Sequence, residues 1–510
     1  SKFSKALVLC KLAGRKVLDG VGQPTLVVEI FCTRICSTVM SSHSQIPENA
    51  LPETIEADEK ERNDSVNTAV EWVNESLSTM LRDLKPTEQC QIDELLGEFF
   101  ANKVEERKEI ERQEEEAKAI LALTSDTPPP TPVPMKKKAG KSGKKMPVVE
   151  KLIPPAEPVE PVLGGSLAIG GASLAVAKAG AIVSHIPLYL HIALLKHDQE
   201  SPKGMSLPLP MVTVLNCEKM SPAKLKLVKE VMLIPPVQLS FKQGIERILD
   251  IQKELTKLLE NPSKMPQQAD SKKGRTPYSG RKAPPQTLKR ISHLGCLTAG
   301  YDNLEQLILL IQTACNNMGL ELGTDMYLAI NCAAHELMDY DKEKYEILTG
   351  IFKSPDEMVA MYVEMIDNFP FIIALIDPLR KEDRQQWSDI FLALGSKRFL
   401  IAEDAATHTS KLKIDQNINI AKCSGVVLKY LNQTKVSDLI ELTGILDGQS
   451  YITILGSPDG ESSDESLVDL AVGLGASFVK LGGLSRGERV AKYNRLLAIE
   501  EELAANGTLR

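Results

Sequence analysis

Two short segments, FIIALID at residues 371–377 and FLIAED at residues 399–404, show the pattern that decides the fold. Each is a run of apolar residues that ends in a carboxylate. Four further segments repeat the pattern with other polar ends: MYLAIN ends at Asn331, GVVLK at Lys429, YITILGS at Ser457 and SFVK at Lys480. Short, β-branched runs bounded by turns are typical of strands that are buried on both faces.

Helical stretches alternate with these strands, for example at residues 354–369 and 466–474. This alternation predicts βα units arranged around a parallel sheet. In a (β/α)8 barrel the chemistry takes place at the C-terminal ends of the strands. The sequence therefore predicts an α/β protein whose candidate active site is the set of residues that end these strands.

Composition limits the class of protein. A chain of 510 residues is long enough for two or three domains. The net charge of -8 argues against general nucleic-acid binding. The nine cysteines form no CxxC pair and their number is odd, which favours a reduced, intracellular and cytoplasmic protein.

No uninterrupted apolar stretch reaches the roughly 18 residues of a membrane span, so no membrane association is expected. The longest candidate, residues 163–195, is interrupted by glycines, Lys178, His185 and Pro187. The chain begins at Ser1 without a methionine or a signal peptide. We expect that the natural N-terminus precedes it.

The first part of the chain predicts a small antiparallel sheet within residues 6–40, where two apolar runs flank the turn sequence LDGVGQPT. Helices are expected at residues 65–84, 87–102 and 104–121. The third is almost entirely charged, which is usual for a solvated face or a spacer rather than for core.

Two compositionally biased segments are expected to be extended or disordered surface inserts. Residues 127–161 are rich in proline and include six lysines between positions 136 and 145, and residues 261–286 are rich in Pro, Ser, Lys and Arg. Either segment could bind a partner or be a solvated loop without a binding role.

The glycine-rich stretch at residues 163–181 could be mistaken for a phosphate-binding loop. It lacks the GK[ST] ending and follows no clear strand, so close helix packing is the preferred interpretation.

Three long segments resemble the enolase family. VLDGVGQPTLVVEI is similar to the family's IFDSRGNPTVEVDL, and SLAVAKAGA with HIPLYLHIALL is similar to SLAVCKAGA with VPLYRHIADL. The stretch DLAVGLGASFVKLGGLSRGERVAKYNRLLAIEEEL is similar to the family's C-terminal sequence almost residue for residue. The chain resembles most a divergent, testis-type branch of this family.

The resemblance implies an enolase-like fold: an N-terminal α+β domain followed by a (β/α)8 barrel of ββαα(βα)6 order. The N-terminal domain would comprise residues 1–103 and 162–205, separated by a charged helix and insert at 104–161, and the barrel residues 206–510. Family members convert 2-phosphoglycerate to phosphoenolpyruvate in glycolysis with magnesium, and are usually homodimers.

The resemblance also implies roles for individual residues. Lys429 matches the catalytic base, and Lys480 and Glu230 match substrate-binding residues. Glu403 stands where the family has a metal-binding aspartate, and Asp377 is the carboxylate nearest to a second ligand. Ser44 falls at the family's mobile-loop serine, at the metal site.

Several positions depart from the family pattern. Asn331 and Ile376 replace two metal-binding carboxylates, and Leu294 replaces the general acid, for which His293 is a possible substitute. Ser457 and Pro458 replace the histidine and arginine that hold the phosphate. A general acid alone typically contributes about 10²–10⁴ in rate, so activity is expected to be weak or absent.

Two hypotheses of different class follow. In the first the protein is an altered enolase, with Lys429 as base and Glu403 and Asp377 as remaining magnesium ligands. In the second it is a non-catalytic structural or partner-binding subunit, in which Lys429 and Lys480 form buried salt bridges with Glu230, Glu403 or Asp377. The testis-type resemblance then implies a sperm flagellum and axonemal protein partners, with residues 104–161 as the partner-binding elements.

Overall fold

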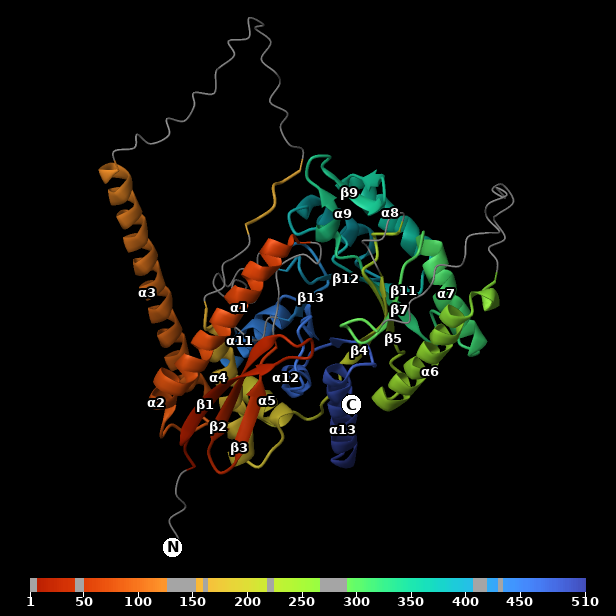
Figure 1. Ribbon diagram of the computed structural model, residues 1–510. Coiled ribbons are helices and arrows are strands. Elements are labelled where there is room, and N and C mark those ends of the chain that lie inside the picture. Colours follow the sequence, from red (N-terminus) through yellow and green to blue (C-terminus); the bar gives the residue numbers. More distant parts are fainter. Residues whose placement is uncertain are drawn as a thin grey trace, which may run out of the picture.

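The computed structural model describes residues 7–41, 50–125, 153–158, 164–217, 224–266, 291–406, 420–429 and 434–510. An N-terminal α+β part packs beside a closed barrel (Figure 1). Its three-stranded antiparallel sheet has the order β1 (Lys11–Leu18), β2 (Pro24–Phe31) and β3 (Ile35–Val39). The predicted small sheet is thus confirmed.

Helices α1 (Pro52–Trp72), α2 (Ser78–Leu81) and α4 (Ser166–Val183) accompany this sheet. The helix predicted from residue 65 begins thirteen positions earlier, because Pro52 at the first turn suits a helix start. Helix α4 is the glycine-rich stretch. A Cβ on Gly171 would lie 2.9 Å from Val28, so the absence of a side chain lets helix and sheet approach closely, as predicted.

Helix α4 is also long and apolar enough to cross a membrane, contrary to the sequence expectation that no segment is. However, most of it is buried inside the N-terminal core against β2 and β3, as expected for the core helix of a soluble protein.

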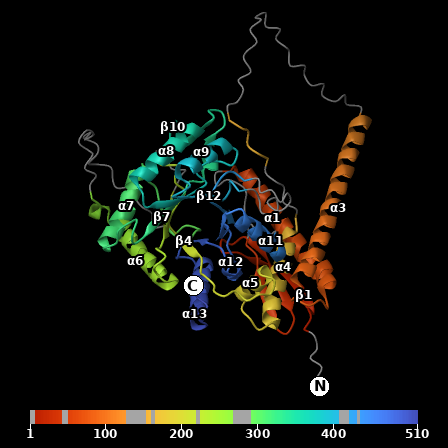
Figure 2. The ribbon, with the colours of Figure 1, turned by 180° about the vertical axis from the view of Figure 1, so that it is seen from behind.

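Helix α3 (Gln89–Thr124) is a single helix of 36 residues, where the sequence had predicted two. No proline or glycine interrupts residues 98–124, so nothing stops the helix at the expected break. Only its first turns are buried, at Gln89, Ile92, Asp93 and Leu96, and the second half stands away from the molecule in both views (Figures 1 and 2).

The barrel contains eight strands in the ring β4, β5, β7, β11, β12, β13, β14 and β15, closed by the pairing of β15 with β4. Their bounds are β4 Leu209–Cys217, β5 Glu230–Ile234, β7 Tyr327–Asn331, β11 Ile372–Ile376, β12 Phe399–Ala402, β13 Gly425–Leu428, β14 Ile452–Gly456 and β15 Phe478–Gly482. Strand β5 is antiparallel to both of its neighbours, and the other pairs are parallel.

The barrel helices are α6 (Phe241–Glu260), α7 (Leu304–Asn317), α8 (Pro355–Asn368), α9 (Arg384–Leu394), α11 (Val436–Gly448), α12 (Ser466–Leu474) and α13 (Gly487–Ala505), and α5 (Leu188–Lys196) leads into the barrel. Strand β6 (Leu297–Ala299) extends the sheet beside β4, and β8 (Met338–Asp339), β9 (Lys344–Leu348) and β10 (Ile351–Lys353) form a small separate sheet. Two strands followed by two helices open the barrel, so the predicted ββαα(βα)6 order is confirmed.

The two parts of the molecule meet along a polar seam. Asp464, in the loop after β14, accepts hydrogen bonds from the Val39 backbone (2.9 Å) and from Lys178 Nζ on α4 (2.8 Å). Nearby, Glu461 accepts a hydrogen bond from Ser41 (2.7 Å) and lies 3.3 Å from the fully buried Lys492 Nζ. These contacts place the end of β3 at the barrel mouth.

Candidate active site at the barrel mouth

The structure brings Glu230, Asn331 and Lys480 together at one end of the barrel. Lys480 is central in β15 and Asn331 ends β7, both on strands that run the same way. Glu230 begins β5, and because β5 is antiparallel to β7, Glu230 lies directly beside Asn331 in the register. A rule based on strand ends misses Glu230 for this reason.

Glu230 is the most completely bonded of these residues. Its Oε1 lies 2.6 Å from Lys480 Nζ and accepts a hydrogen bond from Asn331 Nδ2 at 2.8 Å. Its Oε2 accepts a hydrogen bond from Thr213 Oγ1 at 2.9 Å. Thr213 lies in mid-strand on β4, and nothing in its sequence context distinguishes it from a core residue. Both carboxylate oxygens are therefore satisfied by protein groups.

Glu403, just after β12, joins the two lysines. Its Oε1 lies 3.3 Å from Lys480 Nζ, and its Oε2 lies 3.9 Å from Lys429 Nζ at the end of β13. The Lys480 ammonium is thus shared between two buried carboxylates, Glu230 and Glu403. In this arrangement two lysine side chains, Lys480 and Lys429, offset the charges of Glu230 and Glu403.

The pKa values of this cluster agree with its geometry. Burial disfavours the charged form of Glu230, but Lys480, Asn331 and Thr213 outweigh it and lower the pKa of this carboxyl to about 2. Burial likewise opposes the charged form of Lys480, yet Glu230 and Glu403 raise the pKa of its ammonium. Lys480 is accordingly a permanent cation at neutral pH.

The Asp377 carboxylate binds backbone N–H groups of the loop after β12. Its carboxylate accepts hydrogen bonds from the backbone N–H groups of Glu403 (2.8 Å), Asp404 (2.8 Å) and Ala405 (3.2 Å). Its own backbone has a φ of 47°, an uncommon conformation for a residue other than glycine. Burial, with the nearby carboxylates of Asp404 and Glu403, raises its pKa to about 6 against the opposing charge of His335.

The residues present do not fit a magnesium ion. Magnesium requires near-octahedral oxygen coordination, usually from one or two free carboxylates together with waters and substrate oxygens. Here Ile376 is apolar, and the Asn331 amide donates to Glu230 while its oxygen accepts a hydrogen bond from the Ala333 backbone (3.1 Å). The Asp377 carboxylate is occupied by backbone donors. Within the described ranges, no group of three or more His, Cys, Asp or Glu side chains is arranged to hold a metal.

The remaining sequence candidates lie around this cluster. Leu294 is 7% exposed in a tight turn, and its backbone oxygen accepts a hydrogen bond from Gly483. Its neighbour His293 places Nε2 3.4 Å from Asp459, and the backbone oxygen of His293 accepts a hydrogen bond from Arg489 at 3.1 Å. Ser44 lies outside the described residues.

Sequence reasoning did not single out Arg489 on α13, which is 1% exposed. Its guanidinium donates to the backbone oxygens of His293, Leu481 (3.0 Å) and Pro458 (3.2 Å). It thereby holds the loop of His293 and the loop of Pro458 in place. A buried arginine bonded to carbonyl groups needs the fold to be recognised, because its partners are backbone atoms.

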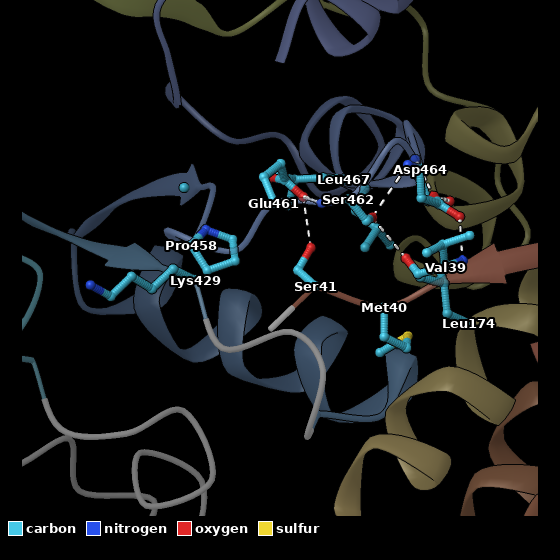
Figure 3. Close-up of a pocket in the computed structure, with 13 residues that line it drawn as sticks. Val39, Met40, Ser41, Leu174, Lys429, Pro458, Glu461, Ser462, Asp464 and Leu467 are labelled. Carbon is cyan, nitrogen blue, oxygen red and sulfur yellow. Dashed lines mark hydrogen bonds between the residues drawn. The ribbon is translucent and has the colours of Figure 1, made fainter. Parts of the chain in front are cut away.

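A small pocket, open to solvent, lies beside the cluster at the seam between the two parts of the molecule. Lys429 and Pro458 lie at one end, and Val39 and Asp464 at the other (Figure 3). Ser41 points across it toward Glu461. The pocket thus joins the end of β3 to the ends of β13 and β14.

Comparison with known proteins assigns the chain to a family. Residues 204–510 match the family described as Enolase, C-terminal TIM barrel domain, and the chain belongs to the enolase family. Among its relatives, Enolase 4 of Homo sapiens is 53% identical over 100% of this chain and 82% of its own length. Enolase 4 of Mus musculus is 50% identical (99% and 83%), and Enolase 4 of Danio rerio is 36% identical (98% and 84%). The resemblance found from sequence motifs is confirmed.

Proposed function

We propose that this enolase-family protein is a non-catalytic, partner-binding or structural subunit. The observation that supports it most directly is the position of the Lys480 ammonium, 2.6 Å from Glu230 and 3.3 Å from Glu403. The charges of the two carboxylates are balanced by two lysines of the protein itself, since Lys429 also lies 3.9 Å from Glu403, so the cluster carries no net charge without a divalent ion.

The reaction of the family needs a base with a lowered pKa, a general acid, and cations that hold a doubly charged intermediate. Lys429 stands at the position of the base, and its ammonium lies 3.9 Å from the Glu403 carboxylate. Leu294 stands at the position of the acid and cannot donate a proton. Ser457 and Pro458 offer no charge to a phosphate group.

The resemblance to a testis-type branch supports a place in the sperm flagellum, with axonemal proteins as partners and a homodimer as the assembled form. The charged second half of α3 is the described element that favours a binding role, because its side chains are exposed and make no contact with the core. Cytoplasmic location agrees with the nine cysteines, none of which forms a disulfide bond in the described part of the chain.

The alternative is an altered enolase in which Lys429 remains the base. To separate the two, the full chain is incubated with magnesium and 2-phosphoglycerate, and phosphoenolpyruvate is measured beside Lys429→Ala. A matched control is Lys435→Ala, which removes a lysine whose partner is Asp438 outside the cluster. We expect all three proteins to give the same background signal. Turnover that is lost in Lys429→Ala and kept in Lys435→Ala would establish the enzyme.

A further inference from the structure

A short segment of the insert is seated on the barrel rim. Residues 153–158, with the sequence IPPAEP, run in extended form beside the loop between β11 and α9 (Figures 1 and 2). Ile153 is 8% exposed, so this end of the segment is buried. The contact partners are three consecutive residues of the loop, Arg380, Lys381 and Glu382, which we term the rim clamp.

Arg380 is held rigidly before it reaches the segment. Its side chain, 1% exposed, donates from Nε and Nη2 to the two oxygens of Asp383, each at 3.0 Å. Its backbone N–H donates to Tyr345 Oη (3.0 Å), and its backbone oxygen accepts a hydrogen bond from Trp387 (3.1 Å). The second Nη2 hydrogen remains, and it is donated to the backbone oxygen of Pro154 at 2.7 Å. A donor fixed in this way loses little entropy on binding.

The other two residues of the rim clamp hold Glu157. Its backbone N–H donates to Glu382 Oε1 at 3.2 Å, and its carboxylate lies 3.3 Å from Lys381 Nζ. The rim clamp therefore binds three groups of the segment: the backbone oxygen of Pro154, and the backbone N–H group and the carboxylate of Glu157.

The spacing of these contacts suits the sequence of the segment. Three of the five residues from 154 to 158 are prolines, which favour the polyproline II conformation. That helix has three residues per turn, so Pro154 and Glu157 lie on the same face. Proline-rich segments bind preformed sites well because little chain entropy remains to be lost.

We propose that the rim clamp is a docking site for an extended, proline-containing peptide with an acidic residue three positions after the accepting carbonyl, and that residues 153–158 occupy it in cis. This goes beyond the proposed function, since it does not depend on whether the barrel is catalytic. A tethered segment has an effective concentration in the millimolar range, so it excludes the same peptide offered in trans at micromolar concentration.

The test uses the full chain and a fluorescein-labelled peptide KLIPPAEPVEP, with binding followed by fluorescence anisotropy. In the release variant, Ile153→Asp with Glu157→Lys, the tethered segment loses its buried anchor and its charge. We expect this variant to bind the peptide at least about tenfold more tightly than the natural chain does. Equal binding by the two, or no binding by the release variant, would overturn the proposal.

A charge exchange then tests the site itself without removing the buried Arg380. Adding Lys381→Glu to the release variant should weaken binding of this peptide about tenfold, and a peptide with lysine in place of the glutamate should regain it. Lys397→Glu, at the far end of α9 and exposed, serves as the matched control and should leave the affinity unchanged. If Lys381→Glu behaves like Lys397→Glu, the peptide binds elsewhere and the proposal fails.

Discussion

At the scale of single residues, the barrel mouth is governed by charge compensation. Glu230 is 2% exposed and lies among Lys480, Asn331 and Thr213, so both oxygens of its carboxylate interact with groups of the protein. Burial of a charge is costly unless it is paired and hydrogen-bonded. Removal of one partner is therefore expected to cost far more than removal of the pair.

We predict that Lys480→Met lowers the free energy of unfolding by about 3–5 kcal/mol, because two buried carboxylates lose their cation. The double variant with Glu230→Gln should recover part of this loss, and urea unfolding measures both. Lys224→Met, which breaks an exposed pair with Asp302, is the control and should cost less than about 1 kcal/mol. A Lys480→Met loss no larger than that of the control would contradict the account.

The same pair gives a prediction for pH. The folded pKa of Glu230, about 2, lies below its ordinary value of 4.5. Its contribution to stability is therefore complete above about pH 4.5 and is lost as the pH falls toward 2. The deficit of Lys480→Met should shrink over this window, since the natural protein loses this contribution and the variant, without the lysine, does not have it. Unfolding curves at neutral pH and at about pH 3 check this, and a deficit independent of pH would count against it.

Magnesium should not stabilise the protein. A specifically bound ion at one hundred times its dissociation constant adds about 2.7 kcal/mol to the free energy of unfolding. Because Lys480 and Lys429 already compensate Glu230 and Glu403, we expect the melting temperature to be the same in excess magnesium and in excess chelator. Differential scanning calorimetry measures the difference, and a rise of several degrees with magnesium would show that an ion binds.

At the scale of elements, α3 has two halves that differ in packing. Leu96 is fully buried in the N-terminal core, whereas Leu123 near the other end is 86% exposed. Ion pairs between neighbouring turns, such as Arg107 with Glu111 (3.2 Å), support the exposed half but are solvated. Tertiary packing thus stabilises only the first half.

We predict that Leu96→Ala lowers the free energy of unfolding by about 2–5 kcal/mol, because it removes buried methyl groups and leaves a cavity. The same substitution at Leu123 serves as its matched control and should change stability by less than about 0.5 kcal/mol. Urea unfolding followed by circular dichroism distinguishes them. Equal effects would mean that the second half of α3 is covered by other parts of the chain.

The sequence was a good guide to elements but a partial guide to the site. Apolar runs located β7, β11, β12, β13, β14 and β15, and so placed Asn331, Asp377, Glu403, Lys429 and Lys480 at or near their polar ends. Which carboxylate lies beside which lysine depends on the tertiary fold. The three polar contacts of Glu230, with Lys480, Asn331 and Thr213, could therefore not be predicted from the spacing of residues in the sequence. The docking of residues 153–158 also escaped prediction, because its partners lie more than 220 positions away.

At the scale of the whole molecule, the seam joins two parts whose cores are separate clusters. Asp464 links them through Val39 and Lys178, and the Lys178 and Asp464 side chains are 17% and 10% exposed. Charge-assisted hydrogen bonds at such positions contribute more than exposed ion pairs do. The seam is therefore expected to couple the unfolding of the two parts.

We predict that Asp464→Ala lowers stability by about 1.5–3 kcal/mol and splits or broadens the thermal transition, since the linkage between the two parts is weakened. Asp302→Ala is the matched control, because that aspartate pairs with Lys224 on the surface and is 63% exposed. Differential scanning calorimetry of both variants provides the measurement. A single sharp transition in Asp464→Ala, as in the control, would show that the seam does not couple them.

The two attachments of the insert have a mechanical consequence. Among the described residues, α3 leads away from the N-terminal core and residues 153–158 are held on the barrel by the rim clamp. The exposed part of α3, residues 105–124, extends for about 30 Å at 1.5 Å per residue. A force that pulls on the insert therefore acts on the N-terminal part through α3 and on the barrel through the rim clamp. Because both parts bear the force together, it does not separate one from the other.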